Sequence, residues 1–447
     1  MSTDQLTNTT TAELKSKIEN KTACVAVVGM GYVGLPLAVA VFGAGYEVLG
    51  FDIDQKKIEC LNNGIPYIKH LGDDFAKEIS ASDRFQASCN PEDLKRADII
   101  SLCVPTPLGK HNDPDLTFVL ESTRAVAKIL RKGQLIVLES TTYPGTTRDE
   151  MLPILEATGL KHGEDFFLAY SPEREDPGRK SESTQSIPKL VGGIDMKSGE
   201  IAHAFYSRVV ERVHLVSSAE VAESAKLLEN IYRAVNIALV NEMKLILEKL
   251  NIDIWEVVEA AATKPFGFEA FYPGPGLGGH CIPIDPFYLT WKAKEVGMPT
   301  RFIELAGEVN QKMPAIVVDK VASALNDDGK SIQNASVLII GVAYKPDVDD
   351  IRETPAVFII EDMIRRGANV SYHDPHVPVF PKMRGHDVNL SSISIDAKLL
   401  SEFDAVLVVT NHSSIDWDLI AMNAKLVIDT RNALALCKEI RARLIKA

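Results

Sequence analysis

The glycine-rich segment at residues 29–34, which reads GMGYVG, constrains the fold more than any other feature of this sequence. It follows a β-branched run at residues 23–28 and opens an apolar helical stretch, after which a second strand-like run occupies residues 47–52. Glycines spaced in this way permit a tight turn, close approach of the backbone to a pyrophosphate and close helix packing. The pattern predicts a β-α-β unit that binds a dinucleotide.

Residues 23–46 carry no charged side chain, so their length alone would also fit a membrane span. Glycine and proline interrupt this stretch repeatedly, whereas a spanning helix has a more even run of Leu, Ile and Val. The preceding residues 1–22 are polar and include acidic side chains, which is typical of neither a secretory signal nor a transit peptide. We expect a frayed arm or short helix there, and no membrane association.

The overall composition excludes several classes of protein. With 447 residues the chain has room for two to four domains. Its net charge of -13 should repel a polyphosphate backbone, so nucleic acid is not expected as a partner. The cysteines are scattered without a C-x-x-C pair, which predicts neither a disulfide framework nor a zinc site and favours a reducing cytoplasm. They are Cys24, Cys60, Cys89, Cys103, Cys281 and Cys437.

Apolar runs that alternate with helical patterns organise the chain as an α/β protein. Runs at 99–104 and 134–139 extend the first β-α-β pattern into a parallel sheet covered on both faces. Residues 219–250 lack Gly and Pro and have apolar residues at helical spacing, so we expect one long helix. Such a helix would join two halves of the chain and offer an apolar face to a second subunit, which predicts a homodimer.

A second β-α-β pattern begins at residue 335, with strands expected at 336–341, 369–374, 405–410 and 425–429 and a helix at 354–366. The fold class we predict is α/β, with two Rossmann-like doubly wound domains joined by the long central helix. The predicted divisions are an NAD-binding domain at 1–216, a central helical dimerisation region with a cysteine loop at 217–318, and a nucleotide-binding domain at 319–447.

Two acidic or basic side chains at strand ends bear on nucleotide choice. Asp52 ends the second strand, where a carboxylate hydrogen-bonds the adenine ribose of NAD, although Lys56 and Lys57 leave NADP open. The second pattern has a single glycine, Gly341, which argues against another dinucleotide. Lys345 could hold a nucleotide diphosphate there, or it could be a solvated loop lysine.

Residues 271–286 read FYPGPGLGGHCIPIDP, and this glycine density lets backbone N–H groups crowd a ligand. Cys281 lies just ahead of a predicted helix, whose positive end favours a thiolate nucleophile over the alternative of an inert buried cysteine. Asp285 reads either as the N-cap of that helix or as a catalytic carboxylate. On the long helix, Lys226 and Asn230 share one face, which is either a solvated surface or the wall of a cleft.

Taken together, these segments resemble the UDP-glucose/GDP-mannose dehydrogenase family over nearly the whole chain. The matching motifs are VVGMGYVGLPLA, VPTP, ESTTYPG, SPEREDPG, SAKLLEN, PGPGLGGHCIPIDP and GVAYKPDVDDIRETP. The resemblance implies oxidation of C6 of a sugar nucleotide from alcohol to carboxylate, with two NAD molecules reduced per substrate. Within the family, the motifs look most like the branch acting on UDP-N-acetylglucosamine, with UDP-glucose, UDP-GalNAc and UDP-ManNAc as rivals.

The resemblance also implies a role for each matching residue. Cys281 matches the nucleophile that forms a thiohemiacetal and then a thioester, Lys226 and Asn230 match the oxyanion-stabilising pair, and Asp285 matches the carboxylate near the thiol. Glu173 and Thr141 match groups linked to water activation. The positions matching the NAD site are Gly29, Gly31, Tyr32, Val33, Gly34, Asp52, Lys57, Thr106, Thr141 and Arg352. Those matching the UDP-sugar site are Glu173, Arg174, Lys226, Asn230, Tyr272, Gly276 and Lys345.

Two positions depart from the family pattern. Many members have a second glutamate four residues after the one matched by Glu173, where this chain has Pro177, so Glu173 or Glu175 would have to supply the hydrolytic base. Many also have an arginine sixteen residues before the nucleophile that reaches the partner subunit's site, where this chain has Pro265, and Lys264 could substitute for it. The hypothesis is an NAD-dependent UDP-N-acetylhexosamine 6-dehydrogenase; the alternatives are a two-electron hydroxy-acid dehydrogenase and a sugar-nucleotide binding protein without activity.

Overall fold

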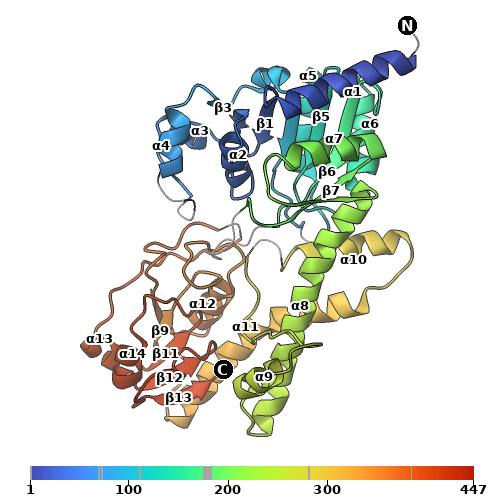
Figure 1. Cartoon of the computed structure of the whole chain (residues 1–447). Coiled ribbons are helices and arrows are strands. Elements are labelled where there is room, and N and C mark those ends of the chain that lie inside the picture. Colours follow the sequence, from blue (N-terminus) through green and yellow to red (C-terminus); the bar gives the residue numbers. More distant parts are fainter. Residues whose placement is uncertain are drawn as a thin grey trace. The chain divides into compact units, whose positions relative to one another are not determined.

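A computed structural model describes most of the chain. The described residues are 3–68, 71, 74–109, 112–174, 184–279, 282–383 and 385–447. They form two compact units, and each unit contains one sheet (Figure 1). The first unit comprises Met1–Glu229 and Phe287–Met298, and the second comprises Asn230–Pro286 and Pro299–Ala447.

The first sheet has eight strands in the order β3-β2-β1-β4-β5-β6-β7-β8. Neighbours are parallel except for β6 and β7, which run antiparallel. The strands are β1 Cys24–Val28, β2 Glu47–Phe51, β3 Phe85–Ser88, β4 Ile99–Leu102, β5 Gln134–Leu138, β6 Phe166–Tyr170, β7 Lys189–Gly193 and β8 Val213–Val216. The order of the first six is the one in which dinucleotides bind outside the carboxyl ends of the strands, between β1 and β4.

Helices cover the first sheet and supply its core. The helical segments are α1 Thr3–Glu19, α2 Gly34–Gly43, α3 Gln55–Asn62, α4 Asp74–Ser80, η2 Pro91–Arg96, α5 Thr117–Ile129, η3 Thr146–Met151, α6 Leu152–Glu156 and α7 Met196–Tyr206. Side chains of α1, α2 and α7 pack with alternate residues of β1, β4, β5 and β6 in one apolar cluster. The central strands β1, β4, β5 and β6 are short and completely buried, as expected for a parallel sheet.

The N-terminal segment is a packed helix rather than a frayed arm. In α1, Leu14 and Ile18 are buried in the first core, and the Ile18 carbonyl accepts a hydrogen bond of 2.8 Å from the Tyr46 hydroxyl. The Lys17 ammonium lies 2.8 Å from an oxygen of Asp98. Only a few apolar side chains of α1 make these contacts. Because the residues around them are polar, the sequence pattern does not predict that the helix packs on the core.

The second sheet has five parallel strands in the order β10-β9-β11-β12-β13. The strands are β9 Ser336–Ile340, β10 Asn369–His373, β11 Ala405–Val408, β12 Leu426–Asp429 and β13 Arg443–Lys446. The helices of the rest of the chain are α8 Ala219–Lys249, α9 Ile254–Ala262, α10 Asp285–Glu295, α11 Arg301–Asp327, α12 Pro355–Arg365, α13 Ala397–Glu402 and α14 Trp417–Asn423. Apolar side chains of α11 and α12 pack on one face of the sheet, and those of α13 and α14 pack on the other.

The predicted α/β architecture of two Rossmann-like sheets joined by a long helix is confirmed. The long helix α8 spans 31 residues, and none of its described residues interrupts it. Helix α10 begins at Asp285 itself, one residue earlier than the N-cap reading of that residue predicts. No helix among the described residues is both long and apolar enough to cross a bilayer.

A buried carboxylate fastens the second sheet at the end of β10. Asp374 Oδ2 accepts hydrogen bonds from the backbone N–H of Val342 (2.7 Å) and Ala343 (3.1 Å), and His412 donates a third at 3.0 Å. Burial opposes ionisation, but the hydrogen bond from His412, together with backbone N–H donors, lowers the pKa of Asp374 to about 2.

We therefore expect Asp374→Asn to destabilise the second unit in a pH-dependent way. Because the folded-state pKa of Asp374 lies below the usual value of about 4, the unfolded chain binds more protons than the folded chain between these two pKa values. Ionised Asp374 therefore adds about 2 kcal/mol to the free energy of unfolding above about pH 4, and this stabilisation disappears as the pH falls through about 2. Denaturant unfolding of Asp374→Asn and the native chain at several pH values measures the difference.

The exposed Asp387→Asn serves as the matched control, because the same change there removes no buried charge. A stability loss for Asp374→Asn that is the same at pH 3 and pH 6 would contradict the role of ionisation.

Candidate active site

The glycine loop between β1 and α2 divides into packing and open positions. Gly29 has φ +97°, and a Cβ there would lie 2.4 Å from the Cys103 carbonyl oxygen. A Cβ at Gly34 would lie 1.8 Å from the Gly29 carbonyl oxygen. At Gly31, by contrast, no heavy atom of the described chain lies within 4 Å of a Cβ. Packing therefore requires glycine at positions 29 and 34. Gly31 leaves a space open that the pyrophosphate of a ligand could occupy.

The start of α2 lies beside this space; in its first turn the Leu35 N–H donates to the Gly31 carbonyl at 3.0 Å and Pro36 has no N–H. Val33 occupies the N-cap position, and no side chain caps the helix. The first N–H groups of a helix lack partners within it and attract an anion such as a pyrophosphate. Tyr32 and Val33 are half-buried against the first core. The loop thus has the geometry and the electrostatics for a dinucleotide phosphate.

Asp52, at the end of β2, is buried and turned toward the glycine loop. Its Oδ2 accepts a hydrogen bond of 2.8 Å from the N–H of Met30, and its Oδ1 accepts one of 2.9 Å from the N–H of Asp54. The Lys57 ammonium lies 2.9 Å from Oδ2. Lys57 is therefore paired with the acid that favours NAD, rather than presented as a free cation for the extra phosphate of NADP.

Thr106 and Thr141 lie in the loops that follow β4 and β5, at the carboxyl edge of the sheet. Thr106 is buried, and its carbonyl accepts a hydrogen bond of 2.9 Å from the Tyr288 hydroxyl. Ser140, next to the half-buried Thr141, ties the two loops together by donating to the Val104 carbonyl at 2.7 Å. Both threonines occupy the edge where ligands of open α/β sheets bind.

Arg352, also predicted for NAD, belongs to the second unit. Its guanidinium pairs with the buried Asp350 at 2.6 Å, and its carbonyl accepts a hydrogen bond of 2.8 Å from Gly279. The structure thus brings together the glycine loop, Asp52 and Lys57. It describes Arg352 as part of a different local network.

Three of the predicted catalytic residues lie on or beside α8. Lys226 and Asn230, one helical turn apart, are both buried, which excludes the solvated-face alternative. The Asn230 amide donates to the carboxylate of Asp285, which is buried at the start of α10, and the Arg233 guanidinium donates to the Asn230 carbonyl oxygen. Asp285 therefore holds a side chain that the sequence singled out, in addition to starting its helix.

The predicted nucleophile Cys281 lies outside the described residues, as do Glu175 and Pro177. The segment leading to Cys281 is described up to Gly279, where a Cβ would lie 2.9 Å from the Tyr344 ring. Described residues resume at Ile282, three residues before Asp285.

Glu173 follows β6 and is largely buried. Its Oε1 accepts a hydrogen bond of 2.7 Å from the Arg174 N–H, and its Oε2 lies 3.6 Å from the Lys189 ammonium. The Arg174 guanidinium pairs with Glu229 at 2.7 Å and donates to the Pro188 carbonyl at 2.7 Å. The alternative interpretation of this segment as an exposed charged loop is therefore wrong for Glu173 and Arg174, its first two charged residues.

Residues predicted for the sugar nucleotide lie within the second unit, apart from those on the first unit described above. Tyr272 is 44% exposed and stacks on Trp255, with ring centroids 5.2 Å apart and planes inclined by 17°. Gly276 has φ +135°, and a Cβ there would approach Pro314 and Pro355. The Lys345 ammonium lies 5.6 Å from the Tyr344 ring centroid.

A charged cluster behind Glu173 was not predicted as part of the site. Glu139 and Lys189 are both buried, with 2.6 Å between a carboxylate oxygen and the ammonium, and the Tyr206 hydroxyl donates to Glu139. Burial would lower the pKa of Lys189, but Glu139 and Glu173 outweigh burial and raise it. Glu139 ends an apolar strand and Lys189 is a lone charge before an apolar run, and these were the only signals in the sequence.

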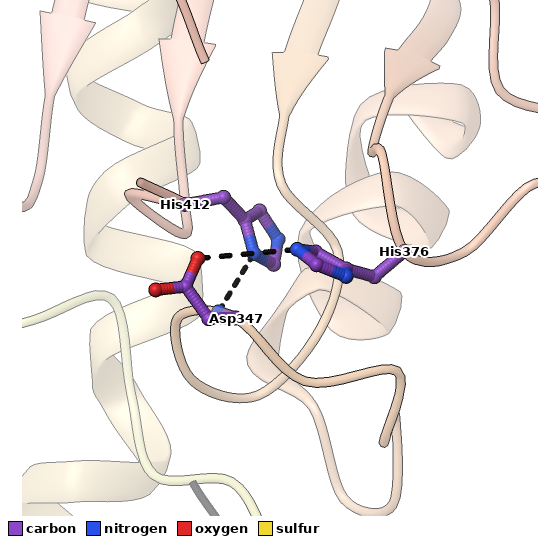
Figure 2. Close-up of side chains that lie close together, drawn as sticks. All are labelled: Asp347, His376 and His412. Carbon is purple, nitrogen blue, oxygen red and sulfur yellow. Dashed lines mark hydrogen bonds and ion pairs between the residues drawn. The ribbon is translucent and has the colours of Figure 1, made fainter. Parts of the chain in front are cut away.

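Three side chains in the second unit could be mistaken for a metal centre (Figure 2). The candidate ligand atoms of Asp347, His376 and His412 lie within 4.8 Å of one another. His412 Nδ1 accepts a hydrogen bond of 3.0 Å from the Asp347 N–H, so Nε2 carries the proton that it donates to Asp374. Both ring nitrogens of His412 therefore have hydrogen-bond partners. The cluster connects three loops at the carboxyl edge of the second sheet.

Comparison with known proteins decides the family. Models of the NAD binding, central and UDP binding domains of the UDP-glucose/GDP-mannose dehydrogenases match residues 23–210, 220–312 and 338–436. The chain belongs to this family. The first of these models is the NAD binding domain, so this enzyme uses NAD, which fits the open space at Gly31 and the orientation of Asp52. Its other substrate is a UDP-sugar.

Several relatives match this UDP-sugar dehydrogenase over most of their length. CapL of Staphylococcus aureus is 40% identical over 390 residues, covering 87% of this chain and 89% of CapL. The UDP-N-acetyl-D-glucosamine 6-dehydrogenase of Pseudomonas aeruginosa is 36% identical over 391 residues, covering 87% and 90%. The solved structure of the UDP-D-ManNAc dehydrogenase from Pyrococcus horikoshii has a TM-score of 0.85 at 33% identity, covering 94% of this chain and 99% of that one.

Two glycine substitutions separate ligand binding from packing. We expect Gly31→Ala to keep the thermal midpoint within about 2 °C, because its Cβ meets no protein atom, and to weaken NAD binding at least about 10-fold. Calorimetric titration with NAD and thermal unfolding measure the two effects.

Gly34→Ala is the matched comparison. Its Cβ clashes with backbone, so both the thermal midpoint and NAD binding should fall together. Native NAD affinity in Gly31→Ala would contradict the assignment of the open space to the cofactor.

Proposed function

We propose that this enzyme oxidises C6 of a UDP-N-acetylhexosamine to the uronic acid, with UDP-N-acetylglucosamine as the favoured substrate. The observation that carries the proposal is the buried hydrogen bond between Asn230 and Asp285, which fixes an amide one turn of α8 after the buried Lys226. Relatives named for UDP-N-acetyl-D-glucosamine and for UDP-N-acetyl-D-mannosamine support the substrate class. UDP-ManNAc, UDP-GalNAc and UDP-glucose are the alternatives.

The proposed roles begin with the sugar alcohol. NAD, when bound, is the hydride acceptor for both oxidations. Lys226 and Asn230 stabilise negative charge as it develops on the C6 oxygen, because desolvated donors act most strongly where charge appears. Asp285 keeps the Asn230 amide oriented, and so determines which hydrogen faces the oxyanion.

Cys281 is the proposed nucleophile. Its thiolate adds to the C6 aldehyde to form a thiohemiacetal, and the second oxidation leaves a thioester. Water then attacks the thioester carbonyl, the C–S bond breaks, and the thiolate is regenerated with the free acid. We assign activation and positioning of that water to Glu173 and Thr141. Pro177 removes the second glutamate found in many members, so Glu173 is the main candidate base and Glu175 the alternative.

Further residues are assigned to binding. Gly29, Gly31, Tyr32, Val33 and Gly34 surround the NAD pyrophosphate. Asp52, Lys57, Thr106, Thr141 and Arg352 complete the proposed NAD set. Arg174, Tyr272, Gly276 and Lys345 hold the sugar nucleotide together with Glu173, Lys226 and Asn230. We also propose that the chain is organised functionally as residues 1–216, 217–318 and 319–447, and that it acts in the cytoplasm to supply uronic acids for polysaccharide.

A homodimer through α8 is the proposed assembly. The helix presents a row of exposed apolar side chains that recur every three, four or seven positions, the spacing by which two helices pack along a seam. These residues are Val221, Leu228, Tyr232, Leu239, Met243 and Ile246, with Leu250 just beyond the helix. A row of this length is covered most simply by the same helix of a second copy. Lys264 is the candidate for a contribution to the partner's site.

Cys281→Ser tests the covalent mechanism. The native enzyme should release two NADH per molecule of acid from UDP-N-acetylglucosamine. The variant should form acid at least about 1,000-fold more slowly, while the first oxidation survives, because a hydroxyl is a far weaker nucleophile than a thiolate. Absorbance of NADH and chromatography of the sugar nucleotide measure both quantities.

Cys437→Ser is the control, since that residue is a free cysteine in the second unit with no assigned role. Undiminished acid formation in Cys281→Ser would refute the thioester. One NADH per product in the native enzyme would indicate a two-electron dehydrogenase instead. Rates with the other three UDP-sugars rank the substrates.

Leu239→Glu tests the dimer. A carboxylate at the centre of the α8 row should raise the dissociation constant of the dimer at least about 30-fold. Sedimentation at several concentrations measures the shift to monomer. Leu436→Glu, at a leucine that is 96% exposed outside α8, should leave the assembly unchanged. A native chain that sediments as a monomer would contradict the proposal directly.

A further inference from the structure

The buried cluster behind Glu173 arises from the one antiparallel pair of the first sheet. β6 and β7 pair with Ala169 opposite Gly193 and Tyr170 opposite Gly192. Continuing that register beyond β6 sets Glu173 opposite Lys189, the first residue of β7. Because β7 runs backwards, its first residue reaches the edge where the parallel strands end. Lys189 therefore lies at the carboxyl edge of the sheet, which is the edge where ligands of open α/β sheets bind.

The charges of the cluster are unequal in number and in exposure. Lys189 lies 2.6 Å from Glu139 and 3.6 Å from Glu173, and it donates to the Pro172 carbonyl at 3.5 Å. Glu139 is fully buried, whereas the Glu173 side chain is 13% exposed. One ammonium therefore faces two carboxylates, an inner one that no solvent reaches and an outer one at the edge of the cluster.

The inner carboxylate is satisfied without Glu173. Glu139 accepts from Lys189 on one oxygen and from the Tyr206 hydroxyl on the other. A buried ammonium needs one such fixed counter-charge to remain ionised. The approach of Lys189 to the second carboxylate is thus additional to what the core requires. It restrains the Glu173 oxygen that the Arg174 N–H does not contact.

We propose that Lys189 is a positioning residue for the reaction, fixing the Glu173 carboxylate as the anion that accepts a proton from the hydrolytic water. Glu139 keeps Lys189 charged and in place. This inference rests on the proposed function of Glu173. In the step concerned, the water oxygen bonds to the thioester carbon, the C–S bond breaks, the sulfur leaves as thiolate, and the water proton passes to Glu173.

Among the described residues, ionisable groups face Glu173 from four segments. Lys189 faces it from β7, Glu139 from the end of β5, Arg174 from the next position, and Cys103 from the end of β4. Burial raises the pKa of the Cys103 thiol well above its usual range, so that group stays neutral. Lys189 is therefore the one cation among these that joins Glu173 to the sheet interior.

Lys189→Met tests the inference. We expect the first oxidation to change less than about 3-fold and hydrolysis to slow at least about 10-fold, because the proton acceptor loses its restraint. Lys189→Arg should restore most of the native hydrolysis rate. Single-turnover kinetics separate the NADH burst from acid release. Lys197→Met, at a lysine of α7 that donates to the Gly163 carbonyl, is the matched control.

The double variant Lys189→Met/Glu139→Gln guards against a folding defect, because it leaves no uncompensated buried charge. A folded double variant with slow hydrolysis and a nearly native first oxidation supports the inference. One with the native hydrolysis rate overturns it, as does a loss of both oxidation and hydrolysis in equal proportion. Glu173→Gln separates the two hypotheses: if it hydrolyses normally, the proposed role of Glu173 fails, whereas slow hydrolysis with native Lys189→Met kinetics refutes positioning alone.

Discussion

A carboxylate at the end of the second strand fastens the loop that leaves the first strand, and this device occurs in both sheets. Asp52 accepts the Met30 N–H in one sheet, and Asp374 accepts the N–H groups of Val342 and Ala343 in the other. Parallel strands end at a common edge, where the backbone of each loop needs partners. The loops that follow β1 and β9 are held in place by these buried anions.

The strands that carry long apolar runs were predictable, because complete burial of a parallel strand demands such a run. β9 and β10 each end one residue before the predicted strand, and α8 ends one residue before the predicted helix. β3, β7, β8 and β13 were missed. β3, β8 and β13 have four residues each, and most of their side chains are only half-buried or exposed, so they lack the continuous apolar signal. β7 begins with a lysine and ends with two glycines, which leaves too short an apolar run. Their pairing is decided by neighbouring strands rather than by their own composition.

The site divides along a similar line. Asp52 and the glycine loop were found because their spacing along the chain is local, within one β-α-β unit. Lys226 and Asn230 were found by helical spacing and by resemblance. The contact of Lys189 with Glu139 joins residues 50 positions apart, and it depends on the reversed direction of β7, which no local pattern of Lys189 reveals. Long-range pairing of this kind requires the topology of the whole sheet.

The hydrogen bond from His412 to Asp374 makes the two sheets chemically unequal. In the first sheet the acid at the strand end faces an open glycine loop, so a ribose hydroxyl can reach it. In the second, three donors already saturate the equivalent oxygen, and a ribose would find no acceptor there. The other oxygen of Asp374 accepts from the N–H groups of His376 and Val377, so this carboxylate is occupied by the loops of its own sheet. The second sheet therefore lacks a counterpart of the Asp52 arrangement.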